Sequence, residues 1–207
     1  MQPALIIACG ALAREIKALI RANGWQGVRL ECLPASLHNR PERIPEAVRG
    51  RLSAARREGV RVFVAYADCG TGGRLDRVLD DYGAERLPGA HCYDFYAGQA
   101  VIAALGEEQP GTFYLTDFLV RHFDRLVLRE LGIERHPQLA ATYFGHYRRL
   151  VYLSQRDDPL LREAAQRAAR RLGLDYEYRH TGYGELGVAL GRVVGGAAAV
   201  GELPWPH

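Results

Sequence analysis

The segment at residues 60–73, with the sequence VRVFVAYADCGTGG, constrains the fold more than any other part of the chain. Its first half is a run of β-branched and aromatic residues without polar alternation, which is typical of a strand buried on both faces of a parallel sheet. Its second half brings Asp68, Cys69 and three glycines, and the apolar residues that follow have helical spacing. Because open α/β sheets bind ligands at the carboxyl ends of their strands, we expect Cys69 to lie at a binding edge.

The rest of the chain alternates short apolar segments with amphipathic helical patterns. We expect strands at residues 4–8, 28–32, 62–66, 112–115, 149–153 and 175–178, and a brief strand or loop at 87–90. We expect helices at 12–20, 45–58, 75–79, 96–105, 117–131, 136–147 and 159–172. This alternation predicts an α/β fold with a parallel, doubly wound (Rossmann-like) sheet. We expect one α/β domain over residues 1–190, with two similar lobes divided near 106–111, and a loosely ordered tail at 191–207.

Composition excludes several classes of protein. A chain of 207 residues that is 48% hydrophobic and 25% charged is typical of a globular protein. The net charge is only +3, and its arginines are dispersed among acidic residues, which argues against a nucleic-acid partner. The four cysteines include no C-x-x-C pair, so we expect reduced thiols in a cytoplasmic protein. No segment reaches the roughly 20 apolar residues of a membrane span, so we expect no membrane partner.

Three of the cysteines, Cys9, Cys69 and Cys92, follow predicted strands and stand beside a glycine or a histidine. We therefore expect them to meet at one edge of the sheet. Thiolates are ligands that select zinc or iron–sulfur clusters, and three protein ligands leave one position open for catalysis. The sequence thus predicts a metal site, with a [4Fe–4S] cluster preferred to zinc. Cys32 lies within a strand and is expected to be structural.

Polar residues near the same edge are candidates for contacts with a small anionic substrate, because polar loop residues are often functional. These candidates are His38, Asn39, Arg40, Thr71, Gly72, Gly73, Thr181 and Tyr183. The candidates for proton transfer are His91, His122 and Asp68.

These residues together predict a cytoplasmic metalloprotein, and they favour an enzyme, a metal-dependent lyase or transferase acting on a small anionic molecule. Two alternatives stay open. One is a metal-free binding protein in which the thiols are incidental. The other is a thiol enzyme with Cys69 as nucleophile, its pKa lowered by a helix N-terminus, and with His91 as base.

Six segments resemble the uncharacterised domain-of-unknown-function family numbered 1638. They are IIACGALAREI (6–16), LPASLHNRPERIPEAV (33–48), YADCGTGGRLD (66–76), HCYDFYAG (91–98), GTFYLTDFLVRHFD (111–124) and TGYGEL (181–186). The resemblance covers about residues 4–190, and the family's cysteines match Cys9, Cys69 and Cys92. Members of that family, found in bacteria and archaea, often occur alongside corrinoid-dependent methyl transfer. The resemblance therefore implies contact with a corrinoid or a methyl-transfer protein, which the metal-free alternative would serve as an accessory protein.

Overall fold

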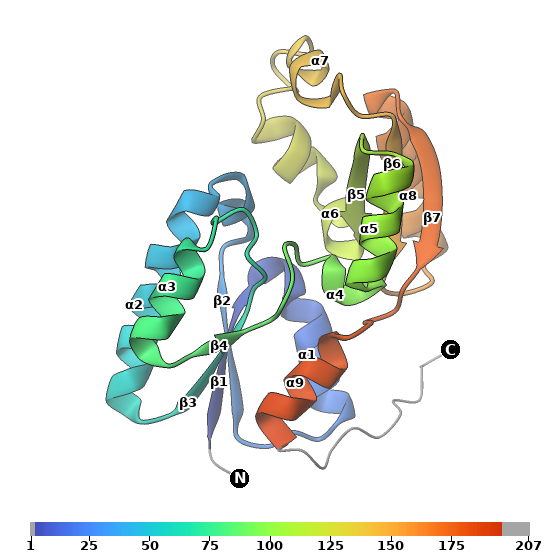
Figure 1. Cartoon of the computed structure of the whole chain (residues 1–207). Helices are drawn as coiled ribbons and strands as arrows, with labels where there is room; N and C mark the ends of the chain where they lie inside the picture. The colour runs from blue at the N-terminus through green and yellow to red at the C-terminus, as the bar shows by residue number, and fades with distance from the viewer. Residues whose placement is uncertain (1–2, 196–207) are drawn as a thin grey trace. The chain divides into compact units, whose positions relative to one another are not determined.

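The computed structural model describes residues 3–195 of the chain and divides them into two compact units (Figure 1). Of the described residues, unit 1 contains 3–91 together with 185–195, and unit 2 contains Cys92–Gly184. Each unit has its own parallel sheet alternating with helices, so the predicted α/β fold with two lobes is confirmed. The chain passes between the units at residues 91–92 and 184–185. Residues 106–111, where the sequence suggested a boundary, lie within unit 2.

The sheet of unit 1 has four parallel strands in the order β2–β1–β3–β4. These strands are β1 (Ala4–Cys9), β2 (Val28–Leu33), β3 (Arg61–Ala65) and β4 (Glu85–Arg86). Every residue of β1 is buried, as expected for an apolar central strand with helices on both faces. The predicted strand at residues 62–66 is β3, and it pairs directly with β1.

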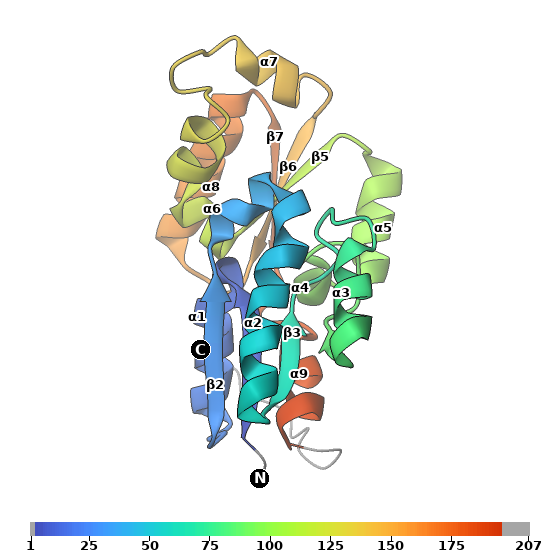
Figure 2. The same cartoon turned by 90° about the vertical axis from the view of Figure 1, so that its left-hand side faces the viewer.

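Helices cover both faces of this sheet (Figures 1 and 2). The helices α1 (Ala13–Ala22) and α9 (Leu186–Gly195) lie on one face, and α2 (Ile44–Glu58) and α3 (Arg74–Tyr82) lie on the other. The sheet of unit 1 is therefore doubly wound. Helix α9 was not predicted: residues 191–195, expected in a loose tail, form its last turns, where Val193 is buried. The rest of that predicted tail lies outside the described residues.

Short 3₁₀ helices fill two connections, one that the sequence predicts as a turn at residues 9–10 and one that it predicts as an irregular loop at residues 33–43. They are η1 (Gly10–Leu12), which follows β1, and η2 (Ala35–Asn39) and η3 (Pro41–Arg43), which follow β2. Proline at residue 41 starts η3, since its fixed φ suits the first turn of a helix. These connections all lie at the carboxyl edge of the unit 1 sheet.

The sheet of unit 2 has three parallel strands, β5 (Thr112–Thr116), β6 (Arg149–Ser154) and β7 (Asp175–His180), in that order. Alternate residues of β6 enter two different cores. Leu150 and Tyr152 pack with α6 (Asp117–Arg121) and α8 (Pro159–Leu172), whereas Val151 and Leu153 pack with Leu105 of α5 (Gln99–Glu108). This pattern explains why β6 is apolar without alternation.

Three helices of unit 2 differ from the sequence prediction. The helix expected at 96–105 is split into α4 (Asp94–Ala97) and α5, because Gly98 adopts a φ of 83° that ends the first of them. The helix expected at 117–131 is the short α6 followed by a π-helical segment, η4 (Asp124–Arg129). The helix expected at 136–147 is the shorter α7 (Leu139–Phe144).

The longest helix in the described part of the chain is α2, with 15 residues. A membrane-spanning helix needs about 20 apolar residues. None of the helices in residues 3–195 is long and apolar enough to cross a bilayer.

Candidate functional site

The carboxyl ends of β1 and β3 flank a topological switch point. The chain leaves β1 through α1 to reach β2 on one side, and it returns through α2, on the opposite face, to β3 on the other side. Open α/β sheets bind ligands where the strand order reverses in this way. Cys9 is the last residue of β1, and Cys69 follows β3 after four residues. Both cysteines therefore stand at the place where this fold class binds ligands.

Cys9 and His38 form a pair of chemically active side chains at this edge. The Cys9 Sγ lies 3.7 Å from His38 Nδ1 and accepts a hydrogen bond of 3.5 Å from the backbone N–H of Ala11. Cys9 is buried, and burial raises its pKa to about 11 although the Ala11 N–H and Tyr66 act in the opposite direction. The Cys9 thiol is therefore protonated at neutral pH.

His38 stands in η2 as an exposed residue, but its ring is partly shielded from solvent where it meets Cys9. This desolvation lowers the pKa of His38, and the charge of nearby His91 lowers it further. The imidazole is therefore neutral at pH 7 and can accept a proton. Cys9, predicted as a metal ligand, and His38, predicted as a substrate contact, thus lie side by side.

Gly10 explains why η2 can approach the end of β1. A Cβ atom at Gly10 would lie 3.0 Å from the carbonyl oxygen of Leu33 and 3.4 Å from the backbone nitrogen of Ala35. Only glycine leaves room for the segment that carries His38. The Cys-Gly sequence after β1 is therefore a packing requirement for the Cys9–His38 pair.

Tyr66 is a further member of this cluster that the sequence did not single out. Its ring is almost fully buried just after β3, and burial, followed by the charges of Cys9 and Cys69, raises its pKa. The hydroxyl lies close enough to Cys9 to shift its pKa, yet it makes no hydrogen bond of normal geometry within the described residues. A buried hydroxyl without a hydrogen bond of normal geometry is costly, and a ligand atom or a water at this position would satisfy it. A tyrosine within an otherwise apolar strand was the available sequence signal.

The turn after β3 holds Cys69 in an uncommon conformation. Cys69 has a φ of 50°, the one positive value among the described residues other than glycine. Its backbone N–H donates to the carbonyl oxygen of Ala90 at 2.8 Å, and the N–H of Asp68 donates to that of Gly89 at 3.1 Å. The segment leading to His91 therefore lies beside the Cys69 turn. Such strained positions are often found at functional sites.

The carboxylate of Asp68 occupies the inside of the same turn. It accepts hydrogen bonds from the Thr71 hydroxyl at 2.7 Å, from the Gly73 N–H at 2.8 Å and from the Gly72 N–H at 3.1 Å. Burial raises the pKa of Asp68, but the Gly73, Thr71 and Gly72 donors outweigh it and lower the pKa to about 2. Asp68 is therefore ionised at neutral pH. It accepts from the N–H groups of Gly72 and Gly73, which the sequence predicted to bind a substrate anion.

The loop at residues 38–41 lies against this turn. A Cβ at Gly70 would contact the Pro41 ring at 3.5 Å, so the two connections touch. Asn39 and Arg40 end η2 and are exposed. Within unit 1, the structure thus gathers Cys9, His38, Asn39, Arg40, Asp68, Cys69, Thr71, Gly72, Gly73 and His91 at the carboxyl edge of the sheet.

The remaining candidates belong to unit 2, which is described by itself. Cys92 does not follow a strand directly, because β4 ends at Arg86. Thr181 follows β7 and donates from its N–H and its hydroxyl to the carbonyl oxygen of Ser154. Tyr183 lies in the next turn, and His122 caps the end of α6. The role of each as a ligand or a proton carrier stays a prediction.

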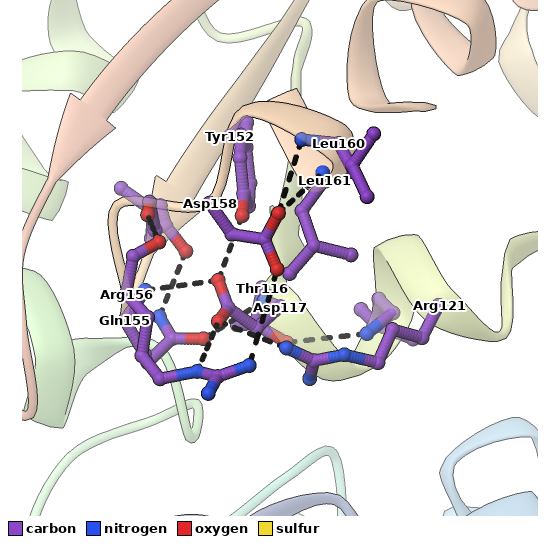
Figure 3. A network of polar contacts seen from close by, with 12 residues as sticks. Thr116, Asp117, Arg121, Tyr152, Gln155, Arg156, Asp158, Leu160 and Leu161 are labelled. Atoms are coloured by element: carbon purple, nitrogen blue, oxygen red, sulfur yellow. Dashed lines mark hydrogen bonds and ion pairs between the residues drawn. The ribbon is translucent and has the colours of Figure 1, made fainter. Parts of the chain in front are cut away.

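Unit 2 has a buried polar network at the carboxyl edge of its own sheet (Figure 3). The Asp117 carboxylate is buried at the start of α6, and its Oδ1 accepts hydrogen bonds from the Tyr152 hydroxyl at 2.7 Å and the Gln155 N–H at 3.0 Å. Its Oδ2 lies 3.3 Å from the Arg121 guanidinium and 4.0 Å from that of Arg156. The Gln155 side chain completes the network by accepting from the Asp117 N–H at 2.8 Å.

This network ties β5, α6 and β6 together and satisfies the buried charge. Contact with the Asp117 carboxylate, together with burial as the larger cause, raises the pKa of Tyr152. The sequence placed Asp117 and Gln155 after strands but did not indicate that they contact each other. A buried carboxylate is costly unless paired, so an aspartate directly after an apolar strand was the available signal.

The described residues contain no group of three or more histidine, cysteine, aspartate or glutamate side chains arranged to hold a metal ion. The separation of Cys9 Sγ and His38 Nδ1 fits two ligands of such a site, because about 3.6 Å separates a sulfur and a nitrogen bound to one tetrahedral zinc ion. Two ligands do not complete a protein metal site. The three-cysteine site stays a prediction, since Cys92 lies in the other unit.

The family described as "Protein of unknown function (DUF1638)" matches residues 32–190 of the chain. This match spans well over half of the sequence. The chain belongs to the DUF1638 family. The matched range of DUF1638 contains His38, Cys69 and Cys92, whereas Cys9 and its motif lie before it. No curated protein and no solved structure matched the chain in these comparisons.

Proposed function

We propose that unit 1 is an enzyme domain that acts on a small anionic molecule at the β1–β3 switch point. The reacting centre is the Cys9–His38 pair. The observation that carries this proposal is the 3.7 Å separation between Cys9 Sγ and His38 Nδ1 at the carboxyl end of β1. A cysteine beside a histidine base is a recurrent arrangement for nucleophilic catalysis.

The chemistry is the attack of the Cys9 sulfur on an electrophilic carbon of the substrate. As the new carbon–sulfur bond forms, His38 takes the thiol proton on Nδ1, and the leaving group departs with the electrons of the broken bond. His38 then returns the proton to the leaving group. In a second step a water molecule, deprotonated by His38, attacks the same carbon, the carbon–sulfur bond breaks, and the Cys9 sulfur takes the proton back from His38 to become a thiol again. A base is needed because burial raises the pKa of Cys9 to about 11. The lowered pKa of His38 keeps its imidazole in the neutral form at pH 7, the form that can take a proton while the carbon–sulfur bond forms.

Three neighbouring groups fit substrate binding. The Tyr66 hydroxyl, buried without a hydrogen bond of normal geometry in the described residues, can donate to a substrate oxygen. Arg40 and Asn39 are exposed at the end of η2, on the loop that contacts the Cys69 turn. Arg40 is the proposed partner of the substrate anion, because the amides of the turn already bind Asp68.

A metal enzyme is the second candidate, favoured by the soft sulfur and nitrogen donors of Cys9 and His38. Zinc or a [4Fe–4S] cluster held by Cys9, Cys69 and Cys92 is the form of this candidate that the sequence predicts. An accessory role in corrinoid-dependent methyl transfer also stays a prediction from the family resemblance. We propose the cytoplasm, a reducing compartment, for all these candidates. The four cysteines lie in the described part of the chain and are free thiols there.

Anoxic purification followed by zinc, iron and sulfide analysis separates the two candidates. The thiol mechanism predicts no stoichiometric metal, and it predicts that iodoacetamide modifies Cys9 in the folded protein. The variants are Cys9→Ser and, as matched control, Cys32→Ser, because Cys32 is exposed and belongs to neither proposed centre. Stoichiometric metal that is lost in Cys9→Ser and kept in Cys32→Ser would replace the thiol mechanism by the metal candidate.

A further inference from the structure

Unit 2 contains a hollow of about 500 Å³ between the α6–η4 segment and α8. This volume falls within the range of small-molecule pockets. Its lining is rich in arginine and includes one carboxylate, that of Asp124, among the described residues. The lining arginines are Arg121, Arg125, Arg129, Arg167 and Arg171.

The arginines that line the hollow come from two parts of unit 2. Arg121, Arg125 and Arg129 follow one another at intervals of four residues along α6 and η4, and Arg167 and Arg171 have the same spacing on α8. Like charges at this spacing on a helix repel each other. A fold that keeps both sets of arginines around one hollow therefore has a positive site that an anion would stabilise.

The backbone of η4 is itself unusual. The N–H of Glu130 donates to the carbonyl oxygen of Arg125 at 3.1 Å, a bond between residues five apart. Such π-helical segments are rare and occur frequently at functional sites. On the opposite wall, α8 presents Ala164 and Ala168, whose small side chains leave the space open.

The ion pairs of the lining arginines leave their guanidinium groups available to bind an anion. Arg121 is anchored from behind by the buried Asp117 carboxylate. The pairs Arg129–Glu134, Arg167–Glu163 and Arg171–Asp124 are all strongly exposed. Exposed pairs of this kind contribute little stability, so an anion can replace the carboxylates. Arg125 has no ion pair within the part of the chain that the structure describes.

His122 lies in the lining of the hollow, and its pKa responds to the positive charge of the nearby arginines. Its ring packs edge-on against Phe118 with centroids 4.6 Å apart. Burial lowers the pKa of His122, and the charges of Arg125 and Arg121 lower it further. A bound anion would oppose these two charges and raise that pKa.

We propose that this hollow of unit 2 binds a phosphorylated small molecule through the guanidinium groups of Arg121, Arg125, Arg167 and Arg171. Guanidinium groups match phosphate oxygens in two-pronged hydrogen bonds, and several of them around one pocket suit a ligand with more than one negative charge. The site is independent of the Cys9–His38 pair, which lies in unit 1.

Calorimetric titration of the full chain with inorganic pyrophosphate tests the proposal. We expect saturable binding that Arg125→Gln and Arg167→Gln each weaken about tenfold, in the range of losing one charge-assisted contact. Arg170→Gln is the matched control, since Arg170 is an exposed arginine of α8 outside the lining. Arg170→Gln and Cys9→Ser should bind like the wild type. In NMR titrations, the pKa of His122 should rise when pyrophosphate is added.

Absence of saturable binding would overturn the proposal, as would equal weakening by Arg170→Gln. A single-stranded RNA that binds more tightly and displaces pyrophosphate would also overturn the assignment to a small molecule. None of these results bears on the proposed reaction at Cys9, which metal analysis and alkylation test separately.

Discussion

At the scale of single residues, the positions of Asp68 and His38 decide how the candidate site can work. Asp68 lies beside Cys69, but its carboxylate already accepts three hydrogen bonds from donors in its own turn. His38 comes from a distant loop and is the partner that Cys9 meets. Asp68 is therefore a residue that shapes the turn, and His38 is the proposed base.

Replacing Asp68 by alanine should lower the free energy of unfolding by about 2 kcal/mol, because three donors lose an ionised acceptor. Asp80→Ala, an exposed aspartate of α3 without a side-chain contact in the described residues, should change it by less than about 0.5 kcal/mol. Chemical denaturation measures both. Equal effects of the two variants would contradict the structural role of Asp68.

The effect of Asp68→Ala should also depend on pH. The pKa of Asp68 is about 2 in the folded chain and 3.8 as an ordinary carboxyl group. Its contribution is therefore fully present above pH 3.8 and is lost as the pH falls through 2. Denaturation curves of the wild type and Asp68→Ala should converge over this interval, and a constant difference down to the acid limit would contradict the assignment.

Much of the candidate site could be predicted at the residue scale, but its pairings could not. Cys9, His38 and Cys69 were identifiable from strand ends, glycines and an irregular loop. The partner of Cys9 depends on where η2 folds back over β1, a tertiary contact that no local pattern encodes. Tyr66 was missed because it looks like one more apolar residue of a buried strand.

At the scale of elements, Gly10 controls how η2 packs on β1. Gly10→Ala should destabilise the chain by about 1–2 kcal/mol, because the new Cβ would stand 3.0 Å from the Leu33 carbonyl oxygen. Gly50→Ala is the control, since Gly50 lies within α2 with open space around it. This second change should stabilise the chain by about 0.5–1 kcal/mol. Thermal unfolding shows whether the two shifts have opposite signs, as required.

The Asp117 network joins elements of unit 2. Asp117→Asn should cost about 2–3 kcal/mol, because it removes the charge that Tyr152, Gln155 and Arg121 surround. Asp175→Asn, an exposed aspartate at the start of β7, should be nearly neutral. Urea denaturation compares the two, and a neutral Asp117→Asn would show that the network does not stabilise unit 2.

Strands and the longer helices could be predicted because burial on both faces and amphipathic spacing leave clear patterns in β1, β3, β6, α2 and α8. The π-helical η4 could not, because its three consecutive buried residues, Leu126, Val127 and Leu128, fit an ordinary helix of the same length. Helix α9 was hidden by its glycine-rich sequence, which is typical of a loose segment.

At the scale of the whole molecule, unit 1 is discontinuous in sequence, since the chain leaves it at residue 91 and returns at 185. Local composition indicated a boundary at 106–111, but residues 106–108 are the end of α5, and Pro110 and Gly111 belong to the short connection before β5. Local sequence patterns do not show that α9, which is distant in sequence, belongs to the same unit as β1. The doubly wound sheet it completes places the switch point, and with it Cys9, at the binding edge.

The most direct test of the account is the rate at which iodoacetamide modifies Cys9 at pH 7.5 in the wild type and in His38→Gln, followed residue by residue by mass spectrometry. If His38 is the base for the Cys9 thiol, its removal should slow modification of Cys9 by at least about tenfold. Modification of Cys32, the internal control, should be unchanged. An equal rate at Cys9 in both proteins would contradict the proposed reacting centre.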